Sequence, residues 1–133
     1  MLQVLSLAVM TVFVTSASAV QYGDDTSQFA RDGQCDDMRF FGRPMNGMIL
    51  IEDDILHDAT DCRKLAEAGL ISYWGDVPLD FGSDSGDYTR DGECDDPRFA
   101  GPGMTDTPLL QEDILADATD CKAAYDAGKL RLR

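Results

Sequence analysis

The sequence predicts a small disulfide-rich fold, mostly irregular with short α-helices, built from two tandem homologous units. The first observation behind this prediction is a duplication. The motif Asp32-Gly-Gln-Cys-Asp-Asp37 and the later motif Asp58-Ala-Thr-Asp-Cys62 recur in the same order and without a gap, 59 positions further on, at 91–96 and 117–121. The second observation is that each copy keeps one pair of cysteines among aspartates. One unit is therefore used twice.

The four cysteines are expected to form two disulfides, because cysteine pairs in a small exported chain are usually oxidised. Three pairings are possible. The duplication favours Cys35 with Cys62 and Cys94 with Cys121, since each copy then closes its own loop. Such a closure contributes roughly 3 to 4 kcal/mol in the chain-entropy account. A zinc site made of four thiolates is the competing interpretation, but the chain contains no C-x-x-C pair.

The first residues indicate export. Residues 1–14 are almost wholly apolar and too short to span a bilayer, and small residues follow up to Ala19. We therefore predict a signal peptide over 1–19 and a periplasmic or extracellular protein that has no membrane contact after cleavage. Because the segment carries no Lys or Arg, a retained anchor or a wrongly assigned start are the alternatives.

The formal net charge of −14 falls entirely on the part after the predicted cleavage site. Such an acidic surface repels nucleic acid and anionic membranes. It attracts cations and partner proteins with a basic surface. Acidity alone could serve solubility, but here the same aspartates recur at the same distances from the same cysteines.

Within each copy, local signals predict the elements in a fixed order. An Asp-Gly turn leads to the first cysteine, and a loop rich in Gly, Pro and Met follows at 42–47 and 101–107. Apolar residues alternate with acids over 50–56 and 109–115, which favours a short helical turn. A helix is then expected to begin at Asp58 or Asp117, with Asp and Thr as candidate N-caps, and to end at Gly69 or Gly128. Strand-like tails close the copies at 70–74 and 129–133.

These signals divide the chain into four parts. They are the signal peptide at 1–19, a first repeat unit at 20–74, a linker at 75–83 and a second repeat unit at 84–133. The linker is assigned on its content of Pro, Gly, Ser and Asp.

The aspartates around each cysteine pair are the predicted metal site. A Cys35–Cys62 bond carries the acids before and after it into side-chain reach, and crowded carboxylates stay costly unless they are protonated, paired or neutralised by a metal. Calcium suits such a site, because it takes six to eight oxygen ligands in irregular geometry. The predicted ligands are Asp32, Asp36, Asp37, Asp58, Asp61, Asp91, Asp95, Asp96, Asp117 and Asp120. The alternatives are that some of these acids pair with Arg31 or Arg39, or cap helices.

The chain resembles known families at these residues. Asp-Gly-x-Cys-Asp-Asp-(Pro)-Arg-Phe with Gly-x-Gly-Met and Asp-Ala-Thr-Asp-Cys is similar to a tandem repeat of exported alphaproteobacterial proteins, over 25–71 and 84–132. The first copy departs from it at Met38 and in the following loop, where the Pro and the Gly-x-Gly-Met are lost. More distantly, the pattern is similar to the calcium-binding Lin12-Notch and LDL-receptor class A modules, which use three disulfides per unit. That similarity implies calcium ligands at Asp36, Asp58 and Asp61, and at Asp95, Asp117 and Asp120.

Function is expected to lie in binding rather than catalysis. His57 is the only histidine and is Ala116 in the second copy, so no repeated Ser-His-Asp set exists, and we expect His57 to face solvent. A carboxylate-dependent hydrolase needs two acids in different environments, whereas both copies carry the same acids. A metal-independent periplasmic interaction or inhibitor protein is the stronger alternative. Its adaptable contacts would be Met45, Met48 and Met104, unless these fill the core.

Overall fold

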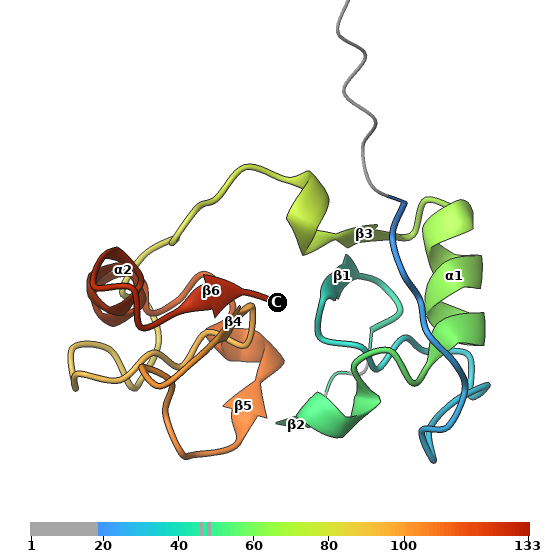
Figure 1. The fold of residues 1–133 in the computed structure, drawn as a ribbon, viewed down its shortest axis with the longest axis horizontal. Helices are drawn as coiled ribbons and strands as arrows, with labels where there is room; N and C mark the ends of the chain where they lie inside the picture. Colours follow the sequence, from blue (N-terminus) through green and yellow to red (C-terminus); the bar gives the residue numbers. More distant parts are fainter. Residues whose placement is uncertain (1–18, 46, 48) are drawn as a thin grey trace, which may run out of the picture.

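The computed structural model describes residues 19–45, 47 and 49–133, in which two similar units lie side by side (Figure 1). The signal peptide predicted at 1–19 falls outside the described residues except for Ala19. Disulfides join Cys35 to Cys62 and Cys94 to Cys121, with Cα atoms 4.7 and 4.6 Å apart. Both pairings favoured by the duplication are therefore confirmed. Among the described residues, no helix is both long and apolar enough to cross a membrane.

In the part of the chain that the structure describes, each unit has one short α-helix and its own two-stranded antiparallel sheet. In the first unit, β1 (Phe40–Gly42) pairs with β3 (Ile71–Tyr73), and α1 (Ala59–Glu67) lies beside them. In the second, β4 (Phe99–Ala100) pairs with β6 (Arg131–Leu132), and the helix is α2 (Ala118–Asp126). The sequence predicts the helices and the strand-like tails, which contain β3 and β6. It does not predict β1 and β4, the strands with which β3 and β6 pair.

Both helices end where the sequence indicates. Gly69 and Gly128 follow the last helical turns at φ +70° and +71°, the left-handed conformation that glycine adopts at low cost. The segments that precede the helices contain the short helical turn that the sequence predicts. It is a single 3-10 turn in each unit, at Glu52–Asp54 and Gln111–Asp113, and it follows a two-residue strand.

The start of each helix corrects a prediction. Asp58 and Asp117 occupy the N-cap positions, but neither side chain caps its own helix. Instead, the Thr60 backbone N–H donates to the Asp25 carboxylate at 2.7 Å, from 35 residues earlier in the chain. Thr119 and Asp84 repeat this contact at 2.8 Å. The segment before the Asp-Gly turn therefore caps the helix, and the aspartates at the N-cap positions are left for another role.

The small cores centre on the disulfides. In the first unit, Phe40, Met45, Leu65 and Ile71 are buried around Cys35 and Cys62. Met45 is only 8 % exposed and so fills the core, while Met104 is partly buried against the second core. Met48 lies outside the described residues. Met45 is therefore not exposed, as a contact residue of the metal-independent interaction protein would need to be.

The two units meet through equivalent strands. β2 (Ile49–Leu50) pairs antiparallel with β5 (Leu109–Leu110), in the lower middle of Figure 1. Leu50 lies opposite Leu109, its own counterpart 59 positions later, so the two units are related by an approximate twofold axis at this contact. The chain end strengthens the contact, because the Arg133 guanidinium lies 2.7 Å from the Glu52 carboxylate.

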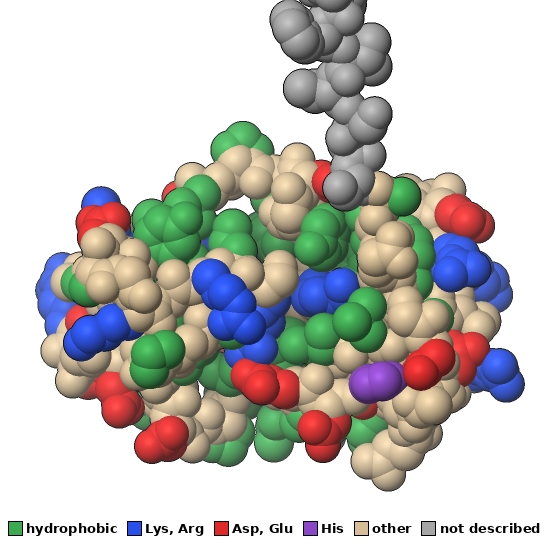
Figure 2. Space-filling model, in the orientation of Figure 1, with side chains coloured by type: hydrophobic (Ala, Val, Ile, Leu, Met, Phe, Trp, Pro, Cys, Tyr) green, Lys and Arg blue, Asp and Glu red, His purple; other side chains and the backbone are tan. Residues whose placement is uncertain are grey.

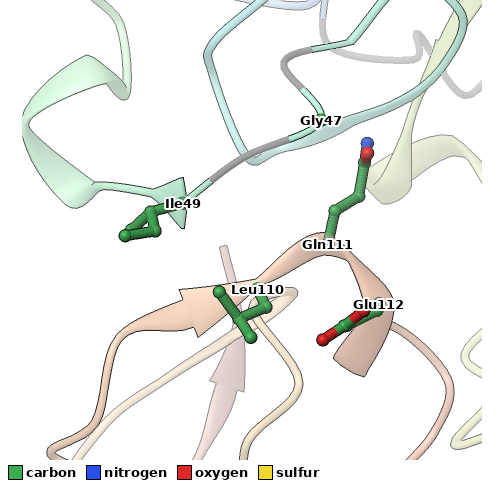
Figure 3. Close-up of a pocket in the computed structure, with 5 residues that line it drawn as sticks. All are labelled: Gly47, Ile49, Leu110, Gln111 and Glu112. Atoms are coloured by element: carbon green, nitrogen blue, oxygen red, sulfur yellow. The ribbon is translucent and has the colours of Figure 1, made fainter.

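A polar hollow of about 410 Å³ opens beside this contact (Figure 3). Gly47 and Ile49 approach it from the first unit, and Leu110, Gln111 and Glu112 from the second. In the face shown in Figure 2, basic side chains lie in the middle and at the left and right ends, whereas acidic ones lie along the lower half and at the upper corners. The acidic net charge is therefore not spread evenly over this face.

Gly23 lies where the start of the first unit packs against the backbone of Leu56. Its φ is +79°, and an added Cβ would stand 1.9 Å from the Leu56 carbonyl oxygen, which itself accepts a hydrogen bond from the Asp24 N–H at 2.8 Å. Gly23→Ala is expected to lower the free energy of unfolding by more than about 1 kcal/mol, because both strain and backbone clash oppose it. Chemical denaturation measures the change. Gly47→Ala is the control, since its Cβ would meet nothing within 4 Å; equal stability of the two variants would contradict the prediction.

Candidate metal centre

The disulfide of each unit brings a helix start against the Asp-Gly turn. The Asp58 carboxylate accepts a hydrogen bond from the Asp36 N–H at 2.8 Å, and Asp61 accepts one from the Gly33 N–H at 2.9 Å. The second unit repeats both bonds, from Asp95 to Asp117 at 3.0 Å and from Gly92 to Asp120 at 3.1 Å. Acids on the two sides of the disulfide therefore meet, as the sequence predicts.

Asp58 lies at the centre of this arrangement. Its side chain is fully buried, and burial raises its pKa to about 7, with further contributions from the negative charges of Asp36, Asp61 and Asp32. One of its oxygens, Oδ1, is buried without a hydrogen-bond partner among the described residues. A carboxylate in that position is uncompensated when ionised.

Asp117 is in the same situation in the second unit. It is 2 % exposed, and burial raises its pKa to about 6, with the charges of Asp120, Asp95 and Asp91 adding to the effect. Its Oδ1 also has no hydrogen-bond partner among the described residues. The neighbouring Asp95 carboxylate has its pKa raised as well, first by burial and then by the charge of Asp91. Both units thus contain a buried carboxylate next to other negatively charged aspartates.

Asp32 and Asp91 form the exposed edge of these clusters. Each accepts a hydrogen bond from the backbone N–H two residues later, at 2.8 Å from Gln34 and 3.0 Å from Glu93. This contact closes the Asp-Gly turn and uses one carboxylate oxygen.

Asp37 and Asp96 are directed elsewhere. Asp37 forms a buried ion pair with Arg39 at 2.5 Å and accepts a hydrogen bond from the Leu56 N–H at 3.0 Å. Asp96 makes the same contacts with Arg98 and with the Leu115 N–H. Of the five predicted acids in each unit, three therefore surround the fourth, Asp58 or Asp117, and the fifth belongs to an ion pair.

The ligand atoms that lie closest together include the sulfurs. In each unit, one carboxylate oxygen of Asp58 or Asp117 and two cysteine sulfurs lie within 4.8 Å of one another, an arrangement that could hold a metal ion. Both sulfurs of each group are bonded to each other, however, and metals bind thiolates. In the oxidised protein, the carboxylates are the ligands that remain.

Two further pairs of acids were missed by the sequence analysis. Asp25 and Asp84 cap the helices and also pair with Arg31 and Arg90, at 3.1 and 3.0 Å. Asp54 and Asp113 are buried at the 3-10 turns, where burial raises the pKa of Asp113. All four recur at the spacing of 59, so a position-by-position comparison of the two copies contained the signal that would have found them.

His57 lies outside the cluster. It is partly exposed, and its Nδ1 is 2.7 Å from the Asp24 carboxylate and 2.8 Å from the Thr26 hydroxyl. It is therefore part of the loop that packs before the helix and contributes nothing to the repeated chemistry.

Searches against protein-family models, curated proteins and solved structures found no match for this chain.

Proposed function

We propose that this protein is an exported tandem calcium-binding, disulfide-stabilised module that acts through binding rather than catalysis. The observation that carries the proposal is the buried carboxylate at Asp58 and Asp117. In each unit it has one oxygen without a hydrogen-bond donor among the described residues, and its pKa is raised first by burial and then by three further acids. A cation bound there would compensate the charge that the protein itself leaves uncompensated.

The chemistry of the ligands favours calcium. In each unit, four aspartates contribute only oxygen atoms, and the loop around the Asp-Gly turn offers backbone carbonyls besides. Calcium tolerates an irregular arrangement of this kind, whereas magnesium requires a stricter octahedron and retains its water. The proposed ligands are Asp32, Asp36, Asp58 and Asp61, with Asp91, Asp95, Asp117 and Asp120 in the second unit.

Binding is favoured over catalysis because the two clusters are alike. In both units the central acid is buried and has a raised pKa, so neither cluster supplies the contrast between one acid and one base that carboxylate hydrolysis needs. The disulfides are typical of an oxidising compartment, which supports a periplasmic or extracellular location. The proposed partner is a protein with a basic surface.

The test is the melting temperature of the exported protein in EDTA, in millimolar calcium and in millimolar magnesium. Calcium is expected to raise it. At a calcium concentration 100 times the dissociation constant, each site would contribute about 2.7 kcal/mol of stability. The variant with Asp58→Asn and Asp117→Asn should lose this increase, because the central ligands are removed.

The control variant carries Asp53→Asn and Asp106→Asn, two exposed acids, and changes the net charge by the same amount. It is expected to keep the calcium response. A response equal for calcium and magnesium, or equal in both variants, would point to general screening of a highly charged protein and would contradict the proposed sites. The metal-independent interaction protein would then be the better proposal.

A further inference from the structure

The two helices differ at five equivalent positions, and at one of these the second helix has an aromatic side chain that the first lacks. The first has Ala66 on α1, where the second has Tyr125 on α2, 59 residues later. In the second unit, the Tyr125 ring packs edge-on against two stacked rings, with its centroid 5.6 Å from Phe81 and 6.1 Å from Phe99. Three aromatic rings thus close this side of the second core.

The first unit keeps the stacked pair but lacks the third ring on the helix. Tyr22 and Phe40 stack at 5.6 Å, the same separation as Phe81 and Phe99. Beside them is a groove of about 540 Å³, whose lining includes Tyr22, Phe40, Ala66 and Ile71. Tyr73 on β3 forms another wall and lies 5.6 Å from Phe40. A groove of this size lies within the range of ligand sites in proteins.

The lining of the groove also indicates the charge of its occupant. Glu67 and Asp76 contribute to it, and the whole chain carries a net charge of −14. In the described part of the chain, two basic groups contact the stacked pair through cation–π interactions. Arg39 lies over the Phe40 ring, and Arg63 lies 5.2 Å from the Tyr22 ring. Acidic side chains beside an apolar groove favour an aromatic group that is accompanied by positive charge.

We propose that this groove binds an aromatic side chain of a partner polypeptide, flanked in the partner by Lys or Arg. The ring would occupy the place that Tyr125 fills in the second unit, against the stacked pair Tyr22 and Phe40. The interaction involves none of the eight proposed calcium ligands, so it goes beyond the proposed metal function and stands or fails independently of it.

The probe is the peptide N-acetyl-Lys-Tyr-Lys-amide, titrated into the exported protein in EDTA while NMR signals of the Ala66 and Ile71 methyl groups are followed. Both signals are expected to shift in a saturable way. A Lys-Ala-Lys peptide tests the need for the ring, and a Glu-Tyr-Glu peptide tests the charge. Each is expected to bind at least about tenfold more weakly.

The decisive variant is Ala66→Tyr, which copies the residue that the second unit already uses. It should fold, keep or raise the melting temperature, and bind the peptide at least about tenfold more weakly. Tyr125→Ala is its counterpart, and is expected to create a second site whose signals shift near Phe81 and Phe99.

Three outcomes would overturn the proposal. They are signals of Ala66 and Ile71 that do not move, an affinity that Ala66→Tyr leaves unchanged, and shifts that depend on protein concentration without peptide, which would identify a second copy of the chain as the occupant. Repeating the titration with calcium separates this result from the metal proposal, since peptide binding in EDTA needs no metal.

Discussion

Asp37→Asn is expected to lower the free energy of unfolding by about 3 to 5 kcal/mol, because it leaves a buried guanidinium without its counter-charge. Arg39 is only 8 % exposed, and its guanidinium forms an ion pair with the Asp37 carboxylate and donates hydrogen bonds to both carboxylate oxygens. The same carboxylate accepts the Leu56 N–H, whose residue has a left-handed backbone at φ +67°. Loss of the charge therefore weakens both the ion pair and a strained turn. Denaturant titration of the oxidised protein measures the change.

Asp96→Asn tests the same device in the second unit and should cost a similar amount. The control is Asp126→Asn, which removes the exposed pair between Asp126 and Lys122. Exposed pairs contribute about 0.3 to 0.5 kcal/mol when they are one helical turn apart. If Asp37→Asn were as mild as this control, the pair with Arg39 would not be a structural element of the fold.

Asp37→Asn also separates two roles for the predicted site residues. The variant should retain the calcium-dependent rise in melting temperature, even from a lower starting point, because Asp37 faces Arg39 rather than Asp58. Loss of the rise in a variant that still folds would return Asp37 to the ligand set that the sequence predicts.

Much of the local structure could be predicted because its signals are adjacent in the chain. The duplication selected one disulfide pairing out of three, and a glycine after each helix marked where it ends. The turn before each first cysteine was visible as an Asp-Gly step. Each of these features needs only a few neighbouring residues or the comparison of one copy with the other.

The remaining features depend on contacts between residues far apart in the chain. The sequence predicts the cap within the segment that begins at Asp58, and only the fold brings Asp25 to the Thr60 N–H from 35 residues away. Arg31 and Arg39 were equally plausible partners of Asp37, and the tight turn at 37–40 selects Arg39. The pairing of β2 with β5 could not be predicted either, because two apolar residues do not specify a strand or its partner.

The groove beside Ala66 shows the same limit in another form. The difference between Ala66 and Tyr125 is visible in the sequence, but its effect depends on what else fills the space. In the first unit Tyr73 stands where the second has Leu132, so a ring has moved from the helix to the strand and part of the space stays open. The volume of the groove therefore depends on how the whole unit packs, and one substituted position does not predict it.

The pH dependence of stability is expected to change sign when calcium is added. The pKa of Asp58 is raised from 3.8 to about 7 and that of Asp117 to about 6, so the folded protein binds these protons more tightly than the unfolded chain does. Without metal, the free energy of unfolding should fall as pH rises from about 4, and level off only above the folded pKa of Asp58, about 7, where both groups are ionised in either state. The slope is on the order of 1 kcal/mol per pH unit for each group.

Calcium reverses this slope because it binds the ionised carboxylates and competes with their protons. With calcium present, stability should therefore rise over the same interval, as ionisation creates the site. Repulsion within a chain of net charge −14 also lowers stability as pH rises, so the slope in EDTA needs a matched control. The variant with Asp58→Asn and Asp117→Asn provides it, since it should flatten the slope in EDTA and abolish the reversal, whereas Asp53→Asn with Asp106→Asn should do neither. A wild-type slope that rises from pH 4 to 7 in EDTA would mean that Asp58 and Asp117 are ionised and compensated within the protein, and the need for a bound cation would disappear with it.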